Sequence, residues 1–180
     1  MPLIVTHVLV GIILIELYRN FFVKDNRKFP RYYILMMAIA CIIPDLDYLA
    51  FYILYFFGFT IEQVHRTFLH TFFLPAIFFI IGGLIYFLKL KYSYFGKKHI
   101  HLSTIFFIFG FGCLIHLLLD MTFSGQIMPF YPLSKYAVGL NLIQYVPSGL
   151  QGLIAPTIDA VLLFFWICWL EFKLKVTRYF

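Results

Sequence analysis

The sequence is poor in charged residues. Asp, Glu, Lys and Arg make up 12% of its 180 residues, about half of their share in a soluble globular domain. Hydrophobic residues make up 63%, including 24 Phe and 13 Tyr, and the mean hydropathy is +0.92. This composition excludes a soluble globular domain, a disordered chain and a coiled coil. It predicts an integral membrane protein.

Cysteine and serine are also scarce. The three Cys, at positions 41, 113 and 168, lie inside apolar stretches, which indicates packing and excludes a disulfide-stapled secreted domain. None of the five Ser stands in a nucleophile-elbow pattern, and the chain has no Gly-rich phosphate loop. A serine hydrolase and a P-loop nucleotide-binding protein are therefore not indicated.

Five apolar stretches are long enough, or nearly so, to cross a hydrocarbon core that needs about 20 helical residues. We expect an all-α membrane protein, a bundle of about five transmembrane helices in one domain over residues 1–180. The approximate spans are residues 3–18, 32–57, 68–88, 102–120 and 153–171.

Basic residues define one face of this bundle. Twelve of the 14 Lys and Arg residues fall between the first two spans, between the third and fourth, or after the fifth. By the positive-inside rule these segments and the C-terminus are cytoplasmic, and the N-terminus lies outside an inner or plasma membrane. Topology therefore accounts for the net charge of +6, and we expect no nucleic-acid partner.

Ionisable side chains inside a membrane are costly, and they usually mark a pathway, a metal or an ion pair. In this chain almost all of them are carboxylates and imidazoles. Those within or at the ends of the apolar stretches are His7, Glu16, Asp45, Asp47, His65, His70, His116, Asp120 and Asp159, with Arg66 as the one cation beside them.

The second stretch contains Pro44, followed by Asp45 and Asp47. Because proline cannot donate a backbone hydrogen bond, we predict that the second helix is broken here. One carboxylate alone would be explained as the cap of a restarted helix. That interpretation does not account for two of them.

Two His motifs complete the set. His116 and Asp120 are four residues apart, so both point to one face of a helix and can bind one ion; the alternative is a structural hydrogen-bonded pair. His65 and His70 are about 140° apart on a helix, so one of them must precede it to share a target. The alternative interpretation of His65 is a hydrogen-bonded residue at the membrane surface, outside any metal site.

The depth of these residues is consistent with a common site. With the topology set by Lys and Arg alone, Asp45 falls about 19 Å above the cytoplasmic face of a core about 30 Å thick. The histidines and Asp120 lie at the outer ends of their spans, at about the same depth as Asp45. Imidazole and carboxylate without thiolate suit a divalent metal, Zn²⁺ first with Mn²⁺ or Fe²⁺ as alternatives, in one or two ions. Such a site favours hydrolysis.

The ordered motifs resemble the YdjM-like family of membrane-bound metal-dependent hydrolases. The resemblance rests on His7, on Pro44 to Asp47, on His65 to Thr71, and on His116 to Gly125 with the prolines that follow. The order of ligands is also similar to that of zinc-dependent phospholipase C and related nucleases. That likeness implies one ion held by Asp45, His70, His116 and Asp120, and another held by His7 with Asp120.

These features together predict a metal-dependent hydrolase of a phosphoester in a lipid or lipid-linked substrate, near the outer membrane face. His7, Asp45, His70, His116 and Asp120 would bind metal. Asp47 and His65 would orient the ligands or act as a general base, and Arg66 would pair with phosphate. No protein partner is inferred.

The alternative function is a metal or proton transporter, or a structural bundle with a polar core. A proton path would need ionisable groups that continue the polar cluster across the membrane. On the cytoplasmic side only Glu16 is available, which disfavours a relay.

Overall fold

The computed structural model describes residues 4–23, 29–88, 98–123 and 125–175, and its regular elements there are helices, apart from an isolated antiparallel bridge between Ile127 and Val138. This confirms the all-α prediction. The α-helices are α1 (Ile4–Tyr18), α2 (Tyr32–Ala40), α3 (Asp47–Leu54), α4 (Ile61–Val64), α5 (Phe73–Phe87), α6 (Lys98–Phe123) and α7 (Ser148–Leu174). Short 3₁₀ or π turns extend or join them: η1 (Arg19–Val23), η2 (Ile43–Leu46), η3 (Tyr55–Phe57) and η4 (Leu142–Tyr145).

Three helical stretches of the described residues are long and apolar enough to cross a membrane: Ile4–Val23, Ile100–Phe123 and Ser148–Lys173. The pair Tyr32–Ala40 and Ile43–Phe57 qualifies as a fourth, bent by 51° at its break. Helix α5 is apolar but has only 15 residues. The prediction of about five spans with a broken second helix agrees with this architecture.

The third apolar segment starts its helix later than predicted, at Phe73 rather than at residue 68. The Thr67 hydroxyl donates to the Val64 carbonyl at 2.6 Å, and the Phe72 amide donates to Pro129 of a distant loop at 2.9 Å. These bonds hold residues 65–72 in turns, while Pro75 suits the first turn of α5. The last helix is longer than predicted at both ends.

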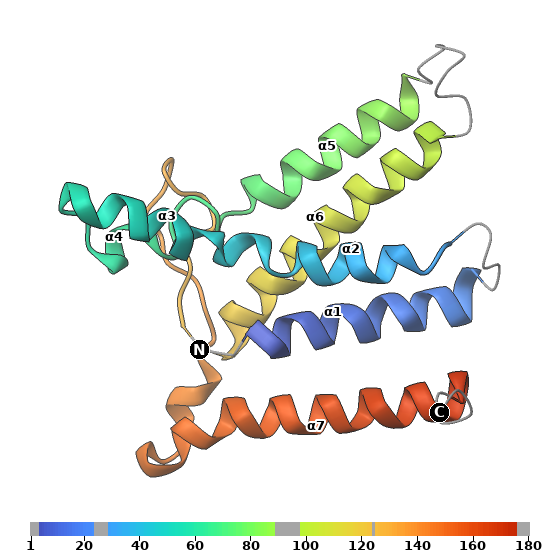
Figure 1. Ribbon diagram of the computed structural model, residues 1–180. Helices are drawn as coiled ribbons and strands as arrows, with labels where there is room; N and C mark the ends of the chain where they lie inside the picture. Colours follow the sequence, from blue (N-terminus) through green and yellow to red (C-terminus); the bar gives the residue numbers. More distant parts are fainter. Residues whose placement is uncertain (1–3, 24–28, 89–97, 124, 176–180) are drawn as a thin grey trace.

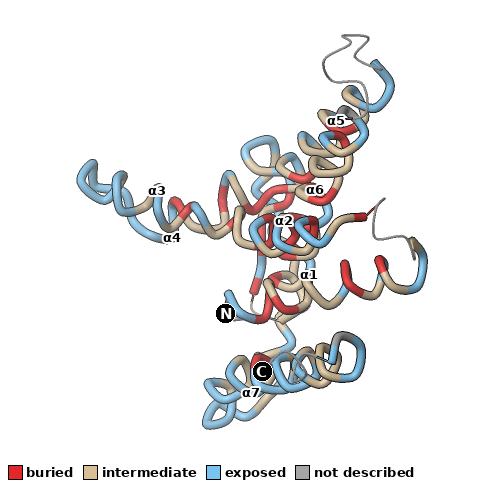
Figure 2. The backbone as a smooth tube through the Cα atoms, turned by 45° about the vertical axis from the view of Figure 1, so that its right-hand side comes forward, coloured by how far each residue is buried: buried red, intermediate tan, exposed pale blue. Residues whose placement is uncertain are grey.

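Helices α1, α2 and α7 run side by side in Figure 1, whereas α5 and α6 form an inclined hairpin, in which α6 crosses α2 and ends beside the start of α1. Helix α6 contacts α5, α2 and α1, whereas α7 packs mainly on α1. Most of the buried residues lie in α1, α2 and α6, whereas the residues of α7 are largely exposed (Figure 2). The core is formed by Ile15, Phe29, Tyr33, Met37, Cys41 and Ile108.

Seven of the basic residues that set the topology lie outside the described residues: Lys24, Arg27, Lys28, Lys89, Lys91, Lys97 and Arg178. The orientation of the termini therefore remains a prediction from charge placement.

Small residues let α2 approach α6 closely. A Cβ built at Gly112 of α6 would lie 2.4 Å from the Ala40 Cβ and 3.0 Å from the Ala40 carbonyl carbon. Next to it, the Cys113 thiol donates to the Ala40 carbonyl at 3.6 Å. Both Cys41 and Cys113 are buried and free, in line with their interpretation as packing residues. Close backbone approach through small residues is typical of membrane helices.

We predict that Gly112→Ala lowers the free energy of unfolding by about 1–3 kcal/mol, because the added methyl overpacks against Ala40 backbone. Gly83→Ala is the matched control, since a Cβ there meets nothing within 4 Å. Denaturant unfolding of both variants in detergent checks this. Equal stability of Gly112→Ala and wild type would contradict the close α2–α6 contact.

Candidate metal centre

The break in the second span supplies two carboxylates and a free carbonyl. Helix α2 ends at Ala40, Pro44 occupies the first turn of η2, and α3 begins at Asp47. Asp45 lies within the break. The Cys41 carbonyl accepts a hydrogen bond from the His116 Nδ1 at 2.7 Å. With its proton on Nδ1, the ring has its Nε2 lone pair available to a ligand.

The segment between α4 and α5 supplies two imidazoles and a guanidinium. Arg66 has a φ of 62°, a left-handed conformation that is rare for a residue with a side chain. Its amide donates to Asp47 Oδ2 at 3.0 Å, and the ring of His65 lies 3.1 Å from the same carboxylate through Nδ1. Asp47 thus fixes the turn that carries His65 and Arg66.

Four donor atoms from three parts of the chain converge. The Nε2 atoms of His70 and His116 are 3.3 Å apart. Asp45 Oδ1 lies 3.6 and 3.5 Å from these two nitrogens, and Asp120 Oδ2 lies 3.5 and 3.8 Å from them. Ligands held at about 2.0–2.1 Å around a tetrahedral ion are about 3.3 Å apart, so this spacing suits a single small cation. We name Asp45, His70, His116 and Asp120 the central cluster.

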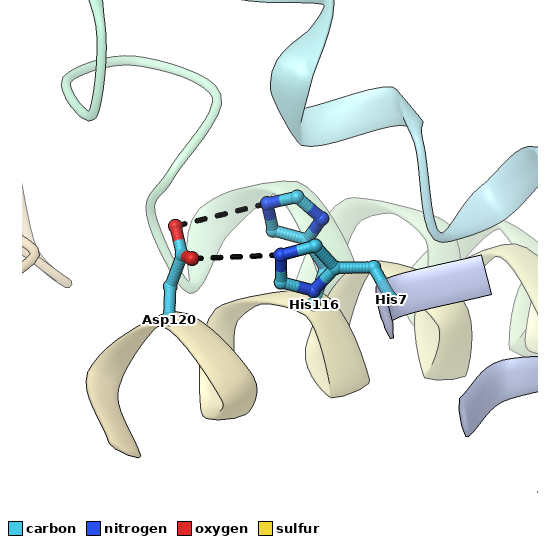
Figure 3. Close-up of side chains that lie close together, drawn as sticks. All are labelled: His7, His116 and Asp120. Carbon is cyan, nitrogen blue, oxygen red and sulfur yellow. Dashed lines mark ion pairs between the residues drawn. The ribbon is translucent and has the colours of Figure 1, made fainter. Parts of the chain in front are cut away.

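His7 adjoins the central cluster through Asp120. Its Nε2 lies 3.6 Å from Asp120 Oδ1, whereas the other carboxylate oxygen faces His116 (Figure 3). The rings of His7 and His116 stack, with centroids 3.9 Å apart. His7, His116 and Asp120 therefore form a second group of donor atoms that could hold a metal. The Nδ1 of His7 is buried and has no hydrogen-bond partner among the described residues.

Asp47 supports the cluster from behind His70. Its Oδ2 lies 3.0 Å from His70 Nδ1, on the opposite side of the ring from the central cluster. His65 is held on both sides, by Asp47 at Nδ1 and by the Tyr48 hydroxyl at Nε2, 3.1 Å away.

Burial leaves one side of the site open. The side chains of His70 and His116 are fully buried, whereas those of Asp45 and Arg66 are 13% and 17% exposed. Arg66 Nε lies 3.7 Å from Asp120 Oδ2. With neutral imidazoles, three carboxylates against this one guanidinium leave a charge of −2. A divalent cation would balance it.

The structure gathers all eight predicted site residues in one region, from α1, the broken second span, the segment before α5 and the end of α6. The roles of the Cys41 carbonyl and of Tyr48 could not be found from the sequence, because any residue has a backbone carbonyl and a tyrosine does not mark a metal site. Asp159 and Glu16 lie elsewhere: Asp159 accepts a hydrogen bond from Thr6, and Glu16 is buried further along α1.

The sequence model of the family described as YdjM inner membrane protein matches residues 1–178. The chain therefore belongs to this family of membrane proteins, as the motifs had indicated. No curated protein and no solved structure matches the chain.

We predict that the purified protein binds at least one transition metal ion per chain, and that His116→Ala and Asp120→Ala lose it because each removes a donor atom. His101→Ala is the matched control, since His101 lies on α6 about 22 Å from His116 and pairs with Tyr33. Elemental analysis after gel filtration measures the metal content. Wild-type protein that stays metal-free in excess Zn²⁺, Mn²⁺ or Fe²⁺ would contradict the site.

Proposed function

We propose that this member of the YdjM inner membrane protein family is a metal-dependent hydrolase of a phosphoester in a lipid or lipid-linked substrate. The observation that carries the proposal is the convergence of two imidazole nitrogens, 3.3 Å apart, with two carboxylate oxygens that each lie 3.5–3.8 Å from both nitrogens, beside a partly exposed arginine. Structural zinc sites are built largely on Cys ligands, whereas imidazole and carboxylate ligands, as in this donor set, are typical of catalytic sites.

The donor set indicates which metal the site would take. It holds nitrogen and oxygen but no thiolate, and its net charge of −2 suits Zn²⁺, with Mn²⁺ and Fe²⁺ as alternatives. Asp45, His70, His116 and Asp120 would hold the first ion. His7, whose Nε2 lies 3.6 Å from Asp120 Oδ1, would hold a second ion together with Asp120.

A divalent metal bound there would polarise a phosphoryl oxygen and lower the pKa of an attacking water to about 7. Asp47 orients His70 through Nδ1 and so directs Nε2 into the cluster. His65 would accept a proton at Nε2, which lies 3.1 Å from the Tyr48 hydroxyl, and Asp47 would stabilise the imidazolium that results.

Arg66 is the group that would bind the phosphate of the substrate. It is the most exposed side chain of the site, and its guanidinium lies beside Asp120. Gly125 gives it room, since a Cβ at Gly125 would come within 2.4 Å of Arg66 Nη1. Because the left-handed backbone at Arg66 is held by Asp47, the same carboxylate that orients His70 also positions the phosphate-binding side chain.

A lipid substrate is supported by the surroundings of the site. Asp120 lies three residues before the end of α6, where a membrane span ends. The loop that follows packs over this end of the molecule through Tyr131, whose ring meets Phe68 edge-on at 5.0 Å. A substrate headgroup would enter beneath this loop, past Arg66, with its acyl chains remaining in the bilayer.

We predict that the metal-loaded protein releases a water-soluble phosphate-bearing product or a lipid product from mixed phospholipid vesicles. Arg66→Gln should lower kcat/KM about ten- to a hundredfold without loss of metal, because it removes a charge-assisted hydrogen bond to phosphate. Lys135→Gln is the matched basic control, since Lys135 is exposed. Mass spectrometry of the products measures turnover.

Metal binding without turnover of any phospholipid or soluble phosphodiester would contradict hydrolysis and favour a metal carrier. Equal turnover by Arg66→Gln and wild type would contradict the role of Arg66.

We also predict that Asp47→Asn weakens metal binding about ten- to a hundredfold, because the amide no longer fixes and polarises His70. Asp159→Asn removes another buried carboxylate, one that lies away from the cluster, and should leave metal affinity unchanged. Competition with a fluorescent chelator measures both affinities. Unchanged affinity in Asp47→Asn would show that His70 needs no such support.

A further inference from the structure

A second polar site lies between α1 and α7, away from the metal centre. A cavity of about 300 Å³ there is lined almost entirely by apolar and aromatic side chains. Its one carboxylate, Glu16, is 7% exposed and lies nine residues after His7, about 13 Å further along α1. The lining residues are Ile13, Glu16, Leu17, Leu162, Phe165, Trp166 and Trp169.

Two buried polar atoms of this cavity lack partners. Neither Glu16 Oε2 nor Trp166 Nε1 has a hydrogen-bond partner among the described residues. The indole of Trp169 also lines this cavity. Buried polar groups in folded proteins are almost always paired, so two unpaired atoms facing one cavity indicate a bound group. That group must donate to Glu16 and accept from Trp166.

The residues around Glu16 favour a cation as the group that donates to its carboxylate. A carboxylate beside the rings of Phe165, Trp166 and Trp169 combines an ion-pair partner with aromatic faces that attract an ammonium group. The accepting part must lie a few ångströms away, opposite the indole N–H. A phosphate linked to an amine by a short carbon chain satisfies both atoms at once.

The position of the cavity suits a lipid headgroup. Glu16 lies three residues, about 4.5 Å along the helix, before Arg19, and the first span ends at Val23. Trp residues favour this level of a membrane, where the rings meet both hydrocarbon and headgroups.

We propose that this cavity binds the headgroup of an aminophospholipid from the leaflet at the basic face of the protein. The ammonium donates to Glu16 Oε2, and the phosphate accepts from Trp166 Nε1. The lipid fills the space between α1 and α7 and joins the otherwise exposed α7 to the bundle. This site is separate from the metal centre, and the lipid it holds is not turned over.

Binding of defined lipids to the purified full chain tests the proposal. Native mass spectrometry is recorded with phosphatidylethanolamine, phosphatidylglycerol and phosphatidylcholine of the same acyl chains, each at equal concentration. We expect one phosphatidylethanolamine per chain, held about tenfold more tightly than phosphatidylglycerol, as one charge-assisted hydrogen bond supplies. Glu16→Gln should abolish this preference, and Trp166→Phe should reduce it.

Asp159→Asn is the matched control, because Asp159 also joins α7 to α1, through Thr6, but lies outside the cavity. It should keep the preference, which separates headgroup recognition from loose packing of α7. Gel filtration shows that each variant is folded. Equal binding of the three lipids by wild type, an unchanged preference in Glu16→Gln, or its loss in Asp159→Asn would overturn the proposal.

Discussion

The break of the second membrane span at Pro44 is the constraint on which the rest of the site depends. An unbroken helix would direct Asp45 and Asp47 to different neighbours and would leave no carbonyl for His116. The break places one carboxylate against the imidazoles of His70 and His116, and places the other behind His70. It also frees the Cys41 carbonyl that orients His116. The two carboxylates of the break thereby pair with imidazoles, and ionisable groups in a membrane interior require such partners.

Much of the fold could be predicted from the sequence, because membrane spans are set by composition. The apolar stretches located the helices, and Pro44 located the break. The late start of α5 could not be predicted, since it depends on a hydrogen bond from Phe72 to Pro129, far along the chain. The exposure of α7 could not be predicted either, because a membrane helix on the outside of a bundle is as apolar as one in its centre.

The candidate site was predictable to the extent that its residue types are rare in membranes. His116 and Asp120 share a helix face by spacing alone, and the remaining groups were expected at the same depth. Which of these residues contact one another could be determined only from the structure. The sequence does not reveal that His7 stacks on His116, that Asp120 offers one oxygen to each of two groups, or that Asp47 holds both His70 and Arg66. These relations join elements that are distant in the chain.

X-ray absorption spectroscopy of the Zn²⁺-loaded protein tests the central claim most directly. The account predicts a first shell of nitrogen and oxygen at about 2.0–2.1 Å, without sulfur at about 2.3 Å, and outer-shell scattering from at least two imidazole rings. His70→Ala should remove part of that imidazole scattering. A shell containing sulfur, or one without imidazole, would contradict a metal centre built from His70, His116, Asp45 and Asp120.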